Sequence, residues 1–188
     1  MPPLLSLGVF GAEMDGVWLL LDVDADRYRL GLPPEARAHS YPRLGQGAID
    51  PRPATAIWPT GVLRVSAAWL ALAHLGRINR ALKHGGLTRL LLALLAHQPR
   101  GRRPRLPAED LVTSFGAVRP YFPASRICRL DGPALLLLLW SYGHPATLQF
   151  GARLEPFSGH CWVELGGRAV NEDPLDLGQY TPLLCVRP

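Results

Sequence analysis

The segment from Cys128 to Trp140 constrains the fold more than any other part of the sequence. Its second half, Leu135 to Trp140, is apolar on every side of a helix, so this helix has to be enclosed by other elements. Gly143 and Pro145 provide a natural end for it. Polar residues interrupt the uncharged stretch 133–152 in which the helix lies, and that stretch is too polar to cross a bilayer.

The composition provides a core for such a helix but interrupts the chain often. The 188 residues are 48% apolar, and they include 19 Gly and 19 Pro. This size suits one ordinary domain or a catalytic domain with a small appendage. Helices are expected at 63–83, 87–97, 107–118 and 128–140, with Gly85-Gly86 separating the first two. Strands are expected at 146–154, 160–165, 168–171 and 181–186, which together indicate an α+β domain.

The first part of the chain has a different pattern. Three short β-like pieces, at 4–10, 17–21 and 27–30, predict a small meander. Six prolines between positions 33 and 59 predict an irregular connection with at most one helical turn. We therefore divide the chain into a β-rich region, 1–59, and a second domain, 60–188.

Charge, cysteine content and the first residues bear on location and partners. Residues 51–130 carry 13 basic residues against two acidic ones, yet the densest run, 100–105, has no interleaved aromatic residue. A solvated linker is favoured over a nucleic-acid site. No basic residue precedes the first apolar stretch, so we expect a cytoplasmic protein without a secretory signal or membrane partner. Cys128, Cys161 and Cys185 are then expected as free thiols.

A thiol, an imidazole and a carboxylate could form one catalytic site. Cys128 opens a predicted helix, where the dipole favours a thiolate. His160 begins a predicted strand, and Glu172 ends its hairpin partner. A thiol nucleophile needs such a base, and the base needs a group that orients it.

The hairpin register decides which acid faces His160. A turn of Gly166-Gly167 alone places Asp173 opposite the histidine, whereas one additional loop residue places Glu172 there. The second register also pairs Val170 with Trp162 and Arg168 with Glu164, which are favourable cross-strand pairs. We therefore prefer Glu172, with Asp173 as the alternative.

These residues resemble a known family. Segment 155–172 is similar to the P-F-x-x-H-x-W-V-x-x-x-x-x-x-x-N-D/E signature of the lasso-peptide biosynthesis B proteins, which are transglutaminase-like cysteine proteases. Cys128-x-x-Asp131-x-x-Ala134-Leu135 resembles their cysteine helix, and Tyr180-Thr-Pro-Leu183 their terminal strand. The similarity covers about residues 107–188 and implies a papain/transglutaminase-like fold, with helices packed on an antiparallel sheet.

The resemblance also implies a function and partners. Such proteins remove the leader from a lasso precursor peptide, and an ATP-dependent cyclase similar to asparagine synthetase then closes the macrolactam. Cys128 would be the nucleophile, His160 the base and then the acid, and Glu172 the orienting carboxylate; no cofactor is implied. The N-terminal part of many members resembles a winged-helix module that binds the leader as an added strand, so Tyr28 and Leu30 would lie on the exposed strand.

Several residues have a plainer interpretation. Pro133 departs from the family pattern and predicts either a kink after Cys128 or a helix that begins at Gly132. Strand alternation turns Cys161 away from His160, so a core position is favoured, as for Cys185. Trp162, counted with the substrate-binding residues, either shields the imidazole or belongs to the core. Surface or capping roles, and no metal site, are expected for the remaining histidines: His39, His74, His84, His97 and His144.

Two other functions remain open at this stage. The same chemistry could serve a transglutaminase-like acyltransferase or deamidase that acts on a glutamine side chain. The site could also be vestigial, in a non-catalytic module that only binds the precursor. Ammonia release would distinguish the first from a peptidase, and tight leader binding without turnover would favour the second.

Overall fold

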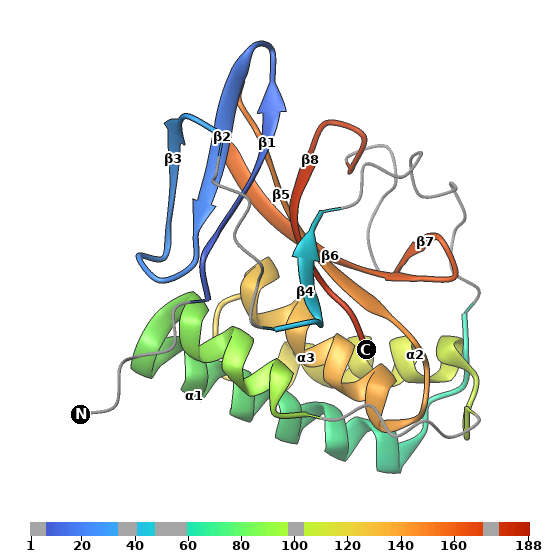
Figure 1. Ribbon diagram of the computed structural model, residues 1–188. Helices are drawn as coiled ribbons and strands as arrows, with labels where there is room; N and C mark the ends of the chain where they lie inside the picture. Colours follow the sequence, from blue (N-terminus) through green and yellow to red (C-terminus); the bar gives the residue numbers. More distant parts are fainter. Residues whose placement is uncertain (1–6, 34–40, 48–59, 98–103, 171–176) are drawn as a thin grey trace.

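The computed structural model describes residues 7–33, 41–47, 60–97, 104–170 and 177–188 (Figure 1). A small sheet stands above the left end of the helical layer, and a larger sheet crosses over the helices. In chain order the elements are β1 (Val9–Met14), β2 (Val17–Asp22), β3 (Arg27–Gly31), β4 (Leu44–Gln46), α1 (Val65–Leu95), α2 (Ala108–Val118), a 3₁₀ turn (Arg119–Tyr121), α3 (Cys128–Ser141), β5 (Thr147–Arg153), β6 (Ser158–Leu165), β7 (Arg168–Val170) and β8 (Thr181–Val186).

The first three strands form an antiparallel meander in the order β1-β2-β3. The meander is confirmed, but the predicted first strand was placed too early. It continues to Met14 because the turn consists only of Asp15 and Gly16, both with positive φ. An Asp-Gly pair suits this tight turn, whose twist matches that of the hairpin. The winged-helix likeness of this region stays a prediction.

The second sheet has five antiparallel strands in the order β4-β8-β5-β6-β7. Strands β5 to β8 lie where the sequence pattern predicts them. Strand β4 was not expected, because its three residues lie in the proline-rich connection. It pairs with β8, Leu44 opposite Val186, so a piece of the N-terminal region completes the second sheet. The division at 59/60 stays a prediction.

Helix α1 is a helical hairpin rather than one rod. Gly85 and Gly86 have non-helical backbone angles, and Gly86 has a φ of 54°. The two limbs meet where Arg77 Nη2 donates to the Ala93 carbonyl at 2.9 Å. The predicted break between two helices is therefore confirmed.

Helix α3 forms the centre of the core. Its residues Leu135 to Trp140 are completely buried, enclosed by α1, α2 and the second sheet. The helix begins at Cys128, since the Ile127 carbonyl accepts hydrogen bonds from the Leu130 and Asp131 N–H groups at 2.9 and 3.0 Å. The predicted alternative, in which the helix begins only at Gly132, is wrong. The carbonyl of Ile127 accepts the first helical hydrogen bonds. The bond that Pro133 cannot donate would go to the Arg129 carbonyl, so its loss does not delay the start of the helix.

Two histidines differ from the expectation of surface or capping roles. His74 is buried, with Nε2 3.1 Å from the Ser141 hydroxyl. Burial, followed by the charges of His97 and Arg77, lowers the pKa of His74 to about 4, so its ring is neutral near pH 7. His144 is also buried, with Nε2 2.8 Å from the Leu106 carbonyl oxygen. Both imidazoles find internal partners, which is what permits their burial.

No helix among the described residues is both long and apolar enough to cross a membrane.

Candidate active site

Cys128 lies at the first position of α3, where the backbone directs the helix dipole at its thiol. Ile127, just before it, is extended at φ −137° and ψ 139°, which lets the chain enter the helix abruptly. The side chain is half-buried. First-turn N–H groups have no intrahelical acceptor, so they provide positive potential at the sulfur. This position favours the thiolate that the sequence predicts.

His160 lies on β6 between two aromatic side chains. Its ring stacks on Trp162, with centroids 6.2 Å apart at 18°, and contacts Tyr180 at 5.3 Å. Trp162 is 2% exposed, and its Nε1 donates to the Glu164 carboxylate at 2.7 Å. The structure therefore makes Trp162 a rigid support for the imidazole. Its contact with a substrate stays a prediction.

The thiol and the imidazole meet, although 32 positions separate them in the sequence. Hydrogen bonds and charge hold the pKa of Cys128 at about 4, well below its ordinary value, and this outweighs the opposing effect of burial. The largest cause is a hydrogen bond from the Cys161 side chain; His160 follows, through a hydrogen bond and through its charge. Near pH 7 Cys128 is therefore a thiolate within hydrogen-bond reach of the His160 imidazole. Such a pair is the activated state of a cysteine nucleophile.

Cys161 is the residue whose place at the site the sequence analysis missed. It is buried in the core, as expected, and it follows His160 on β6. Helix α3 packs on the face of β6 to which Cys161 points. A Cβ at Gly132, one turn after Cys128, would lie 3.6 Å from the Cys161 sulfur. Two features of the sequence could have indicated that Cys161 lies beside Cys128: the absence of a side chain at Gly132, and the position of Cys161 next to His160.

A buried arginine supports the loop that leads into Cys128. Arg119 is 3% exposed, and its Nε lies 2.5 Å from an Asp131 carboxylate oxygen in the first turn of α3. Its guanidinium also donates to the carbonyls of Ala124 at 3.2 Å and Ser125 at 2.8 Å. One side chain thus ties the loop to the beginning of α3, which limits movement of Cys128.

The comparisons with known proteins agree with this geometry. The model of the transglutaminase-like superfamily matches residues 72–185, well over half of the chain. The chain belongs to the transglutaminase-like superfamily. Members are typically catalytic, with cysteine-protease or acyltransferase chemistry. No curated protein matched the chain, and no solved structure did.

Glu172 and Asp173 are the two candidates for the third member of a catalytic triad. Glu172 and Asp173 lie outside the described residues. The hairpin register that favoured Glu172 is wrong, since Arg168 pairs with Leu165 and Val170 with Val163. Gly166 and Gly167 have φ of 59° and 74° and form a two-residue turn, without the additional loop residue. Glu172 therefore stays a prediction that rests on the family resemblance, and Asp173 the alternative.

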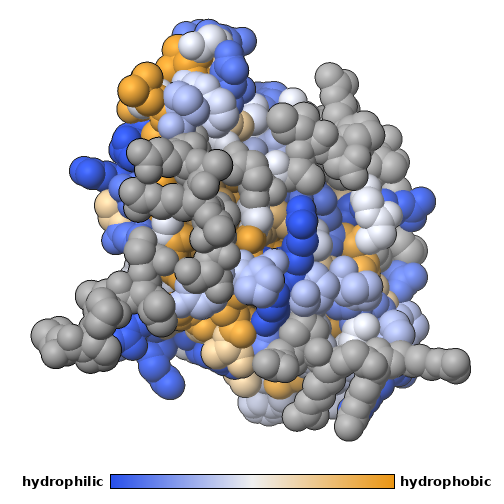
Figure 2. All heavy atoms as spheres, in the orientation of Figure 1, coloured by the Kyte–Doolittle hydropathy of each residue, from blue (hydrophilic) through white to orange (hydrophobic). Residues whose placement is uncertain are grey.

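Tyr28 and Leu30, the predicted peptide-binding residues, lie on the edge strand β3. Leu30 is 61% exposed, and Figure 2 shows hydrophobic surface at the upper left of the molecule, above the end of this strand. Tyr28 instead turns toward the superfamily domain. Its ring contacts Phe157 edge-on, with centroids 5.5 Å apart. The two residues are therefore not equivalent.

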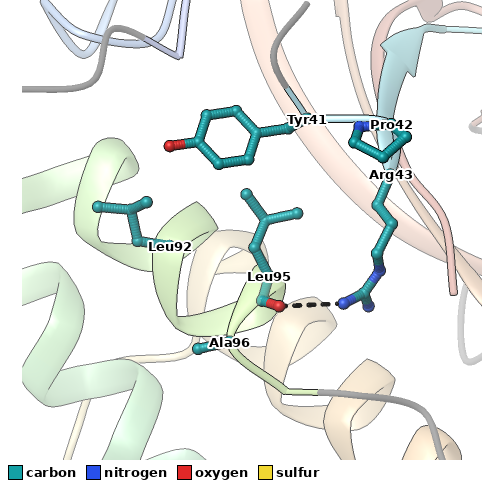
Figure 3. A pocket seen from close by; sticks show the side chains of 6 residues that line it. All are labelled: Tyr41, Pro42, Arg43, Leu92, Leu95 and Ala96. Atoms are coloured by element: carbon teal, nitrogen blue, oxygen red, sulfur yellow. Dashed lines mark hydrogen bonds between the residues drawn. The ribbon is translucent and has the colours of Figure 1, made fainter.

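A separate hollow of about 350 Å³ is lined by residues of the β4 approach and the end of α1, namely Tyr41, Pro42, Arg43, Leu92, Leu95 and Ala96 (Figure 3). Arg43 Nη1 donates to the Leu95 and His97 carbonyls at 3.1 and 3.0 Å. Its guanidinium also stacks on Trp140 at 4.6 Å. This arginine fastens β4 to α1, and the hollow includes neither Cys128 nor His160.

Proposed function

We propose that the chain is the leader peptidase of lasso-peptide biosynthesis. It would cut a precursor peptide between leader and core, and an ATP-dependent, asparagine-synthetase-like cyclase would then close the macrolactam on the new amino terminus. The observation that carries the proposal is the contact of the Cys128 thiol with His160 beside the open strand β3. The resemblance of segment 155–172 to the lasso signature supports the choice of substrate.

The proposed chemistry starts from the Cys128 thiolate and a protonated His160. The Cys128 thiolate attacks the carbonyl carbon of the scissile bond and forms a tetrahedral oxyanion. His160 donates its proton to the leaving amine of the core peptide, and the oxyanion collapses to a thioester that holds the leader. Neutral His160 then takes a proton from water, whose oxygen attacks the thioester. The leader departs as a carboxylic acid, and the thiolate is regenerated.

Strand β3 is suited to hold the leader. It pairs only with β2 among the described strands, so its other edge can take an added peptide strand. Leu30 and the neighbouring Leu32 are exposed at this edge. A peptide bound here would continue past Tyr28 toward β6, which carries His160.

The test is incubation of the protein with a precursor, followed by mass spectrometry. Wild type should yield one leader and one core fragment, whereas Cys128→Ala should yield none. Cys185→Ala, which removes a buried thiol of β8, is the matched control and should cleave. An intact precursor after incubation with wild type and cyclase would refute the proposal, as would cleavage by Cys128→Ala.

The same assay compares Glu172→Gln with Asp173→Asn. We expect the glutamine variant to lose activity by about 10⁴-fold, as loss of an orienting carboxylate does in related triads. The Asp173 variant should stay near wild type. The reverse result would assign the third position to Asp173.

The superfamily match favours one alternative function. A transglutaminase-like acyltransferase or deamidase would use the same thiolate on a glutamine side chain. It would release ammonia from a glutamine peptide and leave the precursor backbone whole.

A further inference from the structure

Tyr28 reaches from the N-terminal sheet to the backbone beside the catalytic histidine. A Cβ at Gly159 would lie 2.7 Å from the Tyr28 hydroxyl oxygen and 2.8 to 2.9 Å from two ring carbons. Gly159 directly precedes His160. Only a residue without a side chain allows the phenol to approach so closely. The ring is therefore packed onto the start of β6, with Phe157 along its edge.

An ion pair fixes β3 on the nucleophile side as well. Arg129, the residue after Cys128, places Nη1 2.6 Å from an Asp26 carboxylate oxygen. Asp26 closes the turn before β3, with φ 48°. The turn before β3 is thus tied to Arg129, which follows Cys128, while Tyr28 on β3 packs on Gly159, which precedes His160.

The Tyr28 hydroxyl lies near the negative charge of the Cys128 thiolate. The side chain is half-buried, and no described residue forms a hydrogen bond with the hydroxyl. Burial is the main cause that raises the pKa of Tyr28, and the negative charge of the hydrogen-bonded Cys161–Cys128 sulfur pair raises it further. The phenol therefore keeps its proton near neutral pH, where Cys128 is a thiolate. A phenolic O–H group without a protein acceptor is available to donate a hydrogen bond to a substrate oxygen.

We infer that the Tyr28 hydroxyl donates a hydrogen bond to the scissile carbonyl oxygen as it becomes the tetrahedral oxyanion. The inference rests on the proposed acyl-transfer function of Cys128. The phenol keeps its proton; the carbonyl π electrons move onto oxygen as sulfur bonds to carbon, and the O–H dipole stabilises that charge. The N-terminal sheet would then contribute a catalytic group as well as a place to bind peptide.

Two reactions of Cys128 separate this role from packing. Acylation by p-nitrophenyl acetate passes through the oxyanion, whereas alkylation by iodoacetamide displaces iodide without one. Tyr28→Phe keeps the ring on Gly159 and Phe157 and removes only the O–H group. We expect the acylation rate to fall by about 10²-fold, with an unchanged alkylation rate. Tyr41→Phe makes the same change in the hollow between the β4 approach and α1, and it should alter neither rate.

Equal acylation rates for wild type and Tyr28→Phe would overturn the inference. A parallel loss of acylation and alkylation would also overturn it, because that result indicates a displaced thiolate. The ester assay needs no precursor. Failure of the leader-peptidase proposal would therefore appear as an uncut precursor with normal ester acylation, and failure of the Tyr28 inference as unaffected ester acylation.

Discussion

At the scale of single residues, the site depends on the ionisation of one thiol. The contacts of Cys128 with Cys161 and His160 hold the pKa of the thiol near 4, against an ordinary value of 9.0. The thiolate therefore persists from neutral pH down to about pH 4 and is lost below it. The rate of iodoacetamide alkylation should show its midpoint near pH 4. A midpoint near 9 would show that the thiol is not activated.

Cys161 should control part of that shift. Its thiol provides the largest of the effects that lower the pKa of Cys128. In Cys161→Ala the alkylation midpoint should move upward by one pH unit or more, since a lost hydrogen bond to a charged group costs roughly 1.5 to 3 kcal/mol. Cys185→Ala should leave the midpoint unchanged, because this thiol lies on β8 and is not one of the groups that lower the pKa of Cys128. Identical midpoints for wild type and Cys161→Ala would contradict this role.

At the scale of elements, β3 combines an open edge with an exposed apolar face. If the leader adds to this edge, Leu30→Lys removes an apolar contact and should weaken leader binding by about 1.5 to 3 kcal/mol. Fluorescence anisotropy of a labelled leader peptide measures this change in binding free energy. Trp69→Lys changes an equally exposed apolar residue of α1 and should have no effect. Weakening by both variants to the same extent would show unspecific hydrophobic binding instead.

At the scale of the whole molecule, the ion pair of Asp26 and Arg129 connects the N-terminal sheet to α3, which packs on the second sheet. Its side chains are 35% and 46% exposed, so its contribution to the free energy of unfolding should be at most about 1 kcal/mol. The ion pair should have a larger effect on the position of Cys128 relative to β3. Asp26→Asn and Arg129→Gln should each slow ester acylation by about tenfold.

A double-mutant cycle checks this coupling. The double variant should acylate no more slowly than either single variant, because both changes break the same connection. Denaturant unfolding of the four proteins measures the stability contribution separately. Additive losses of rate would show that the two side chains act independently of each other.

Much of the fold follows from local patterns. The glycine stop after Lys83, the helix that starts at Cys128 and the β-rich C-terminal end were all predicted, because periodicity and turn residues act over a few positions. Strand β4 was not, since three residues in a proline-rich stretch carry no pattern; only β8 gives them a partner. The hairpin register was also misassigned. Favourable side-chain pairs suggested a bulge, whereas the backbone of Gly166-Gly167 selects a two-residue turn.

The sequence alone determined which residues could be nucleophile and base, because a thiol at a helix start and an imidazole at a strand start are readable from order and spacing. Tertiary packing decided what surrounds them. It brought Cys161 against the thiol, Trp162 behind the imidazole and Tyr28 onto Gly159. These contacts join elements far apart in the chain, and their geometry depends on how α3 and two separate sheets pack together, which no local pattern encodes.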